Sequence, residues 1–277
     1  MNSREITFDG HTVLIEFEKD EVDPLLDFLF GDLEKQEKFE VQAVFRVNFR
    51  SAESQWELTR NQCEMFNGKN LNDLGNVLAG EVLFSLIENN HTGMAIHAGL
   101  VSNDRGCMLL PADSGSGKSS VTTWLLTQGW HYHTDELVII DLKGGHLRAF
   151  TRPLNIKTGG IEPISKIFDI ASHRSELRSC DMATMIPHRL INPDYISDIP
   201  QLGAIVFPHY TANSQPGIQR ISGAEAGLEL MRSNVIARNL PGHGFRSVTQ
   251  LVRSIPGYRL HYQHFDDLWD CFAKVAF

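Results

Sequence analysis

Residues 112–120 bring together glycines, hydroxyls and one lysine at a spacing that can hold a polyphosphate. They read Ala-Asp-Ser-Gly-Ser-Gly-Lys-Ser-Ser, and the first eight fit the phosphate-loop pattern G-x-x-x-x-G-K-[ST] with alanine in place of the first glycine. In such a loop, backbone N–H groups surround the phosphates, the lysine reaches the β- and γ-phosphates, and the last hydroxyl binds Mg²⁺. We therefore predict that a nucleotide is bound by Ala112, Asp113, Ser114, Gly115, Ser116, Gly117, Lys118, Ser119 and Ser120.

The segments on either side of this loop fit a strand and a helix, which is the context that the motif requires. Residues 107–110 form a short apolar run before the loop. Val121 and Trp124 begin an apolar stripe at helical spacing, and Gln128-Gly129 can end that helix. The alternative is a surface turn rich in glycine and serine, and it explains neither flank.

An enzyme that acts on a nucleotide also needs an acid near the γ-phosphate, either to hold Mg²⁺ or to accept a proton. Asp135 and Glu136 place two adjacent carboxylates at a strand start or bend, and Asp141 ends the apolar run 137–140. A Lys-Gly-Gly sequence follows Asp141, so that residue fits a hairpin turn. We favour Asp135, although either acid could be a solvated carboxylate at a strand end.

Other charged residues near predicted strand ends have two interpretations. Arg152 and Lys157 could reach phosphates, or they could be ordinary surface charges. His97 lies on a short predicted strand, where a lone histidine is more often structural than functional. His131 and His133 alternate with Tyr132, but no third ligand has a helpful spacing, so we do not predict a structural zinc site.

Composition limits the classes of partner. The chain has 277 residues, of which 42% are hydrophobic and 21% charged, so we expect a packed core. Its net charge of −9 argues against a duplex nucleic acid as partner, and its cations are too scattered for an anionic membrane surface. The sequence has no apolar run of membrane-spanning length and no signal-peptide core at its start, so we expect a cytoplasmic protein. The four cysteines share no metal-ligand or redox spacing.

Two units follow from the hydrophobic pattern. Residues 1–80 predict a small α+β unit, with a hairpin at Asp9-Gly10, a helix over 23–30 and a strand over 39–50, and this unit packs on the second one or binds a partner. A helix over about 72–89 leads into residues 81–277, the predicted nucleotide-binding unit of α/β type. There we expect strands over 94–100, 107–110, 137–141, 204–207 and 258–262, helices over 224–238, 245–253 and 265–275, and a loop-rich insertion over 161–200.

Three segments together resemble the HPr kinase/phosphorylase family, and most closely its HPr-kinase-related bacterial branch. They are Ile-His-Ala-Gly at 96–99, the phosphate loop at 112–119 and Thr-Asp-Glu-Leu at 134–137. Residues 152–157 and 205–208 are also similar to the related branch. The resemblance covers about residues 92–270 and leaves out the N-terminal unit.

The resemblance implies a P-loop kinase domain with a mixed β-sheet of the type shared with phosphoenolpyruvate carboxykinases. Asp135 would match the acid that accepts the substrate's hydroxyl proton, Glu136 a second acid with a metal role, and His97 a histidine near the first acid. Family members form hexamers, so a homo-oligomer is also implied. No segment after residue 160 matches the family's elements for HPr binding or for the phosphorylase reaction, so HPr is not assumed as the substrate.

The leading hypothesis is a kinase that uses ATP and Mg²⁺ and phosphorylates a hydroxyl of a protein, peptide or small molecule. Asp135, His97 and Lys118 are the predicted catalytic residues, and Ser119 and Glu136 the predicted metal ligands. The alternative from another class is a nucleotide-binding regulatory or scaffold protein without phosphotransfer. A plain ATPase that drives conformational change ranks last, because no arginine finger stands out in the sequence.

Overall fold

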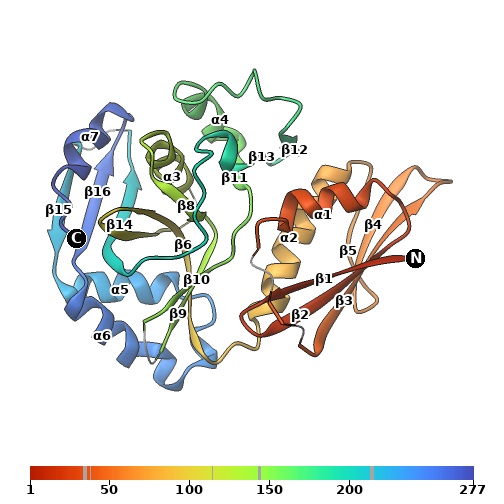
Figure 1. The fold of residues 1–277 in the computed structure, drawn as a ribbon, viewed down its shortest axis with the longest axis horizontal. Helices are drawn as coiled ribbons and strands as arrows, with labels where there is room; N and C mark the ends of the chain where they lie inside the picture. Colours follow the sequence, from red (N-terminus) through yellow and green to blue (C-terminus); the bar gives the residue numbers. More distant parts are fainter. Residues whose placement is uncertain (34–35, 38, 114, 143–144, 213–214) are drawn as a thin grey trace.

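The chain folds around three β-sheets (Figure 1). The computed structural model describes residues 1–33, 36–37, 39–113, 115–142, 145–212 and 215–277. Ser114 of the predicted nucleotide-binding loop lies outside them. Helices are interspersed among the strands along the chain, and the sheets contain both parallel and antiparallel pairs. The prediction of a mixed α/β fold is therefore confirmed.

The N-terminal sheet starts with the predicted hairpin. β1 (Asn2–Phe8) and β2 (His11–Phe17) pair antiparallel, and Asp9 and Gly10 between them have positive φ. β3 (Val41–Arg50) runs parallel to β2, and β4 (Gln55–Arg60) and β5 (Cys63–Gly68) complete the sheet. The alternating apolar pattern predicts β3. It does not predict β5, because that strand is mostly exposed and lacks a buried face.

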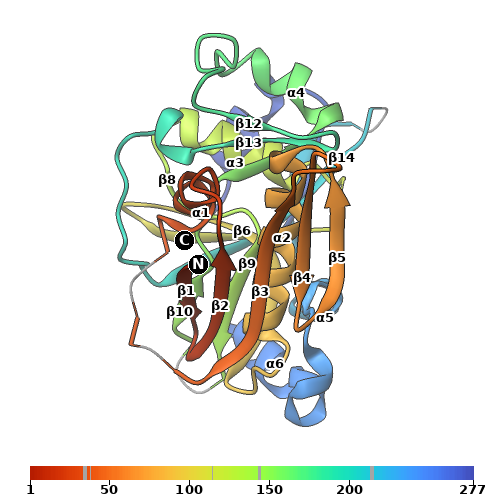
Figure 2. The ribbon, with the colours of Figure 1, turned by 90° about the vertical axis from the view of Figure 1, so that its right-hand side faces the viewer.

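Two helices pack with the N-terminal sheet. α1 (Val22–Phe30) and α2 (Leu71–Ile87) contact each other, and α2 crosses β2, β3 and β4 (Figure 2). Asn70 caps α2 through a hydrogen bond from the Asn72 N–H to its side-chain oxygen. The predicted division at residue 80 falls inside α2, whose apolar side is buried against the N-terminal sheet. The division of the chain into 1–80 and 81–277 stays a prediction.

The larger sheet carries the phosphate-loop segment near its middle. Its order is β10-β9-β6-β7-β14-β16-β15, with β8 also paired to β6, and β7, β14 and β16 are parallel. The strands are β6 (Gly93–Asn103), β7 (Gly106–Pro111), β8 (His131–Thr134), β9 (Leu137–Asp141), β10 (Leu147–Ala149), β14 (Leu202–Tyr210), β15 (Gly217–Ile221) and β16 (Gly257–Tyr262).

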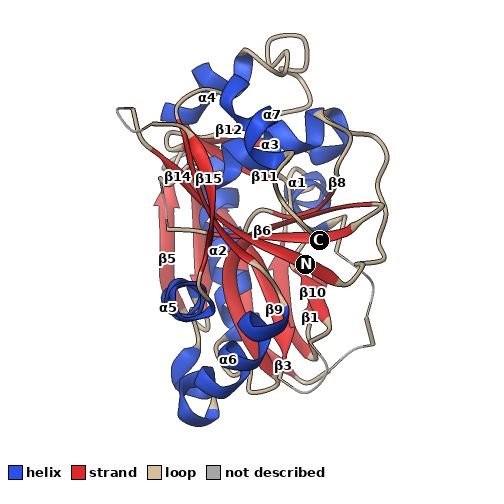
Figure 3. Ribbon diagram, turned by 90° about the vertical axis from the view of Figure 1, so that its left-hand side faces the viewer, coloured by secondary structure: helices blue, strands red, loops and turns tan. Residues whose placement is uncertain are grey.

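Helices cover both faces of this sheet (Figure 3). α3 (Lys118–Thr127), α4 (Thr158–Ser165) and α7 (Asp266–Phe272) lie on one face, and α5 (Gly223–Ser233) and α6 (Phe245–Ser254) on the other. The predicted helix over 224–238 is too long. α5 ends at Ser233 because Asn234 is extended and bridges to Ile96 of β6.

A third sheet lies within and beside the segment predicted to be loop-rich. It has the order β11-β13-β12, formed by β11 (Leu154–Lys157), β12 (Arg178–Ser179) and β13 (Ala183–Ile186). The 3₁₀ turns are η1 (His188–Leu190), η2 (Ala237–Asn239) and η3 (Pro241–Gly244). None of the described helices combines the length and the apolar composition that crossing a bilayer requires.

One apolar core joins the N-terminal unit to the larger sheet. Phe150, which follows β10, is completely buried in the N-terminal cluster, with its ring 5.4 Å from that of Phe8 and 6.4 Å from that of Phe30. Leu137 and Ile139 of β9 belong to the same cluster. The N-terminal unit is therefore packed directly against the strand that follows the predicted acids.

Truncating Phe150 tests this shared core. Phe150→Ala should lower the free energy of unfolding by about 3–5 kcal/mol, because it leaves a cavity between the two units. Phe245→Ala, at a ring that is 64% exposed, is the matched control and should change it by less than about 0.5 kcal/mol. Urea unfolding of the three proteins measures both values, and similar losses for the two variants would contradict the shared core.

His133 on β8 predicts a pH-dependent stability. Its Nε2 lies 2.8 Å from Ser102 Oγ, and burial, with smaller effects of His131 and His188, lowers its pKa to about 4 from 6.5. The unfolded chain therefore binds more protons between these pH values, so this contribution is complete above pH 6.5 and is lost as the pH falls towards 4. Urea unfolding at pH 7 and at pH 4.5 gives the loss in the free energy of unfolding between these two pH values. This loss should be smaller by roughly 2–3 kcal/mol in His133→Gln than in the wild type. Equal losses would contradict this role.

Candidate active site

The phosphate-loop segment connects β7 to α3, as the motif requires. Gly115 and Gly117 have φ of +87° and +88°, a backbone region that side chains rarely adopt. A Cβ at Gly117 would also overlap the hydroxyl of Tyr262. That hydroxyl donates to the Gly117 carbonyl at 2.9 Å, so β16 fixes the point where the loop becomes a helix.

Backbone contacts hold the outer turn of the loop. The Ser116 N–H and hydroxyl both donate to the Asp113 carbonyl, at 3.2 and 2.7 Å. The Tyr210 N–H at the end of β14 donates to the Ser116 carbonyl at 2.9 Å. The loop is thus tied to two strands that run parallel to β7: its neighbour β14 and the next strand, β16.

Asp135 is the residue on which the loop's functional groups converge. The Lys118 ammonium donates to the Asp135 main-chain carbonyl, and the Ser119 hydroxyl donates to its Oδ2 at 3.0 Å. The Tyr132 hydroxyl lies 3.2 Å from Asp135 Oδ1 and 2.9 Å from the Arg152 carbonyl, so its single hydrogen is shared. The Asn155 N–H also approaches Oδ2, at 3.4 Å.

A bend between two strands places Asp135 there. β8 ends at Thr134 and β9 begins at Leu137, and both strands pair with β6. The Thr134 hydroxyl donates to the Phe150 carbonyl at 2.7 Å and accepts the Glu136 N–H at 3.0 Å. From this bend Asp135 meets Lys118 and Ser119 at the start of α3, and Glu136 meets Arg152.

Glu136 is engaged by Arg152 rather than by the predicted metal residue Ser119. The Arg152 guanidinium donates to Glu136 Oε2, and only 8% of the arginine side chain is exposed. Burial alone would raise the pKa of Glu136, but Arg152, Lys118 and His97 outweigh it and lower that pKa. Burial opposes the charge on Arg152 as well, and Glu136 and Asp135 raise its pKa in spite of it.

Lys118 and His97 face the same charges. Lys118 is 7% exposed, and its burial lowers its pKa against the opposing effect of Asp135 and Glu136. Burial and the neighbouring Lys118 also lower the pKa of half-buried His97, which keeps its imidazole neutral at pH 7. Lys118, His97, Asp135, Glu136 and Arg152 therefore form one electrostatic cluster, defined by these five residues.

The structure thus brings Lys118, Ser119 and Asp135 into direct contact and puts Glu136 and His97 beside them. Their roles in nucleotide, metal and proton chemistry stay predictions. The rival acid Asp141 lies at the far end of β9, 3.8 Å from Arg148, and is outside the cluster. Sequence reasoning missed Tyr132 and Asn155. Tyr132 lies three residues before the candidate acid, so its nearness to Asp135 could have been predicted from the sequence. Asn155 reaches Asp135 only through the folding of the chain, so the sequence holds no signal for that contact.

Two oxygens at the cluster are suitable for Mg²⁺. The described residues contain no group of three or more His, Cys, Asp and Glu side chains that could hold a metal. A kinase-type Mg²⁺ needs only one or two protein oxygens, because phosphates and waters supply the rest. The Ser119 hydroxyl and one carboxylate of the 135–136 pair can supply two such oxygens, so the donor set fits this requirement.

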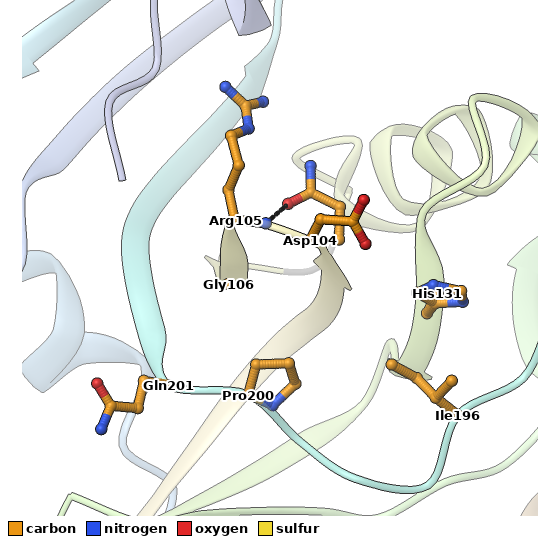
Figure 4. A pocket seen from close by; sticks show the side chains of 8 residues that line it. Asp104, Arg105, Gly106, His131, Ile196, Pro200 and Gln201 are labelled. Atoms are coloured by element: carbon orange, nitrogen blue, oxygen red, sulfur yellow. Dashed lines mark hydrogen bonds between the residues drawn. The ribbon is translucent and has the colours of Figure 1, made fainter.

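A cavity of about 390 Å³ lies away from these groups (Figure 4). It is lined by the β6–β7 turn, including Asp104 and Arg105, by His131 and by Pro200 and Gln201 before β14. The turn is at the start of β7, whereas the phosphate-loop segment follows its end. The Lys118–Asp135 cluster, and not this cavity, is therefore the candidate active site.

No family model matches the sequence, and no curated protein matches it. Among solved structures, the chain is similar to the HPr(Ser) kinase/phosphatase from Coxiella burnetii, with 11% identity over 64% of this chain and 90% of that chain and a TM-score of 0.34. With so low a TM-score, this likeness carries no argument about the function of the chain.

The Arg152–Glu136 pair makes a stability prediction. Arg152→Met should lower the free energy of unfolding by about 3 kcal/mol, because it leaves the Glu136 carboxylate without its buried partner. Adding Glu136→Gln should recover part of that loss, because no charge is then left unpaired. A double-mutant cycle measured by urea unfolding gives the coupling, and additive losses would show that the two side chains act independently.

Proposed function

We propose that this chain is an HPr kinase-like phosphotransferase that moves the γ-phosphate of ATP, with Mg²⁺, to a hydroxyl of a protein, peptide or small molecule. The contact of both Lys118 and Ser119 with Asp135 is the observation that supports it most. These contacts join the ammonium of Lys118 and the hydroxyl of Ser119 to an acid that lies 17 and 16 residues further along the chain. The motif resemblance to the family's loop and paired acids points the same way.

Each residue then has a specific task. The loop amides and Lys118 bind the β- and γ-phosphates, so the lysine exchanges the Asp135 carbonyl for phosphate oxygens. Mg²⁺, when bound, would be held by Ser119 and Glu136 and would neutralise charge on these phosphates. Asp135 accepts the acceptor's hydroxyl proton as the new O–P bond forms and the bond to ADP breaks. His97 and Arg152 border the space beside the acid.

Charge balance explains why these groups are useful together. The cluster holds two acids, Asp135 and Glu136, and two basic groups, Lys118 and Arg152, and only Glu136 among them is partly exposed. A triphosphate brings negative charge that Lys118 and Arg152 offset, and phosphoryl transfer depends mainly on such positioning and neutralisation. The alternative, a nucleotide-binding regulatory protein without transfer, uses the same loop but has no need for Asp135.

Two substitutions separate the kinase from this alternative. Lys118→Ala should weaken ATP binding by at least about tenfold, because it removes the ammonium that the phosphates require. Asp135→Asn should leave ATP binding within about threefold and reduce transfer to a hydroxyl by about 100-fold or more, because the base is lost. Calorimetry with Mg²⁺ and ATP and release of ADP in the presence of hydroxyl acceptors are the measurements.

Asp141→Asn is the matched control, since it changes the rival acid in the same way. It should leave both binding and transfer unchanged. Transfer retained in Asp135→Asn but lost in Asp141→Asn would move the assignment to the other acid. ATP binding without transfer by the wild-type protein to any acceptor tested would support the regulatory alternative.

A further inference from the structure

A second cavity, of about 250 Å³, opens directly beside the phosphate-loop segment. Its walls come from three places: Ala112, Asp113 and Ser116 of the loop, His209 at the end of β14, and Glu229 and Arg232 of α5. Ser116 is therefore shared between the loop turn and the cavity. Any molecule whose phosphates lie on the loop has this cavity within reach.

The order of strands puts this cavity and the acids on opposite sides of the loop. Asp135 follows β8, which pairs with β6 on one side of β7, whereas His209 is on β14, on the other side of β7. A hydroxyl acceptor has to reach Asp135 and so approaches from the β6 side. The rest of an extended nucleotide must leave on the β14 side, because the acids and the acceptor occupy the first side.

The chemistry of the walls suits a neutral, flat, polar group better than a further phosphate. Phe207 and two prolines provide apolar surface. Glu229 is balanced by Arg232 at 3.4 Å and Arg259 at 3.7 Å, and Asp113 adds a second carboxylate to the walls. The cavity therefore has no surplus of positive charge to attract an anion.

The imidazole of His209 also suits a neutral, flat, polar group. Its ring stacks on that of His261, with centroids 5.4 Å apart, and neither His209 Nε2 nor His261 Nδ1 has a hydrogen-bond partner among the described residues. Burial and the neighbouring His261 lower the pKa of His209, so the ring is neutral at pH 7. A neutral ring with spare hydrogen-bonding capacity can stack on or bond to a heterocycle.

We propose that the cavity between the loop, β14 and α5 holds the nucleoside of the donor nucleotide, with Glu229 and His209 as its polar contacts. This rests on the proposed function, because it needs the phosphates to lie on the loop. Its volume falls just below the ~300–1,000 Å³ of whole-ligand sites, as expected if the phosphates lie outside it. A carboxylate accepts hydrogen bonds from ribose hydroxyls or an exocyclic amine, and it repels phosphate. Glu229 therefore favours the nucleoside of the nucleotide over its phosphates in this cavity.

The test compares ATP with inorganic tripolyphosphate, which has the phosphates but no nucleoside. Calorimetry with Mg²⁺ on the full chain should show that the wild type binds ATP more tightly. Glu229→Ala should weaken ATP by on the order of tenfold, through the lost hydrogen bond. It should leave tripolyphosphate unchanged or slightly tighter, because a negative charge has been removed. His209→Ala should likewise weaken ATP alone.

Glu225→Ala is the matched control. Glu225 lies one turn earlier on α5 and also approaches Arg259, at 3.8 Å, but it does not line the cavity, so its loss should affect neither ligand. Thermal unfolding of each variant verifies that it is folded.

Two results would overturn the nucleoside site while leaving the phosphate loop in place. One is equal affinity of the wild type for ATP and tripolyphosphate, and the other is a Glu229→Ala variant in which both ligands change together. Failure of the wild type to bind either ligand would instead reject the proposed function, and the nucleoside site with it.

Discussion

The burial of one ammonium group beside two carboxylates is the constraint on which this site depends. Lys118 opens α3 with little contact with solvent, and burial disfavours its charge. Asp135 and Glu136 counter that effect, while Arg152 balances the surplus of acid. Each group is tolerable in the interior only because the others are present, so the loop, the bend and the strand at 154–157 have to form together.

That dependence explains the arrangement of the larger elements. β6 carries His97 and pairs with both β8 and β9, so one strand sets the position of the histidine and of the bend with the acids. β14 and β16 hold the loop from its other side through Tyr210 and Tyr262. The N-terminal sheet packs against β9 and Phe150, which supports the same bend from behind. The cavity on the β14 side follows from the same order of strands.

The sequence predicted what is local and missed what depends on distant pairing. The strand and the helix that flank the loop, and the position of Asp135 rather than Asp141 beside it, follow from short motifs of a few residues. The end of α5 was misplaced because Asn234 leaves the helix to pair with Ile96, far away in the chain. Asn155 reaches both Asp135 and Asn76, and the wall formed by Glu229 meets the loop only after the sheet has assembled, so neither had a signal in the sequence.

The most direct measurement is a crystal structure with Mg²⁺ and a non-hydrolysable ATP analogue. Our account predicts that the Lys118 ammonium leaves the Asp135 carbonyl for the β- and γ-phosphates, that the γ-phosphate lies beside the Asp135 carboxylate, and that the metal contacts Ser119. A triphosphate bound away from residues 112–119, or an Asp135 carboxylate remote from the γ-phosphate, would contradict it.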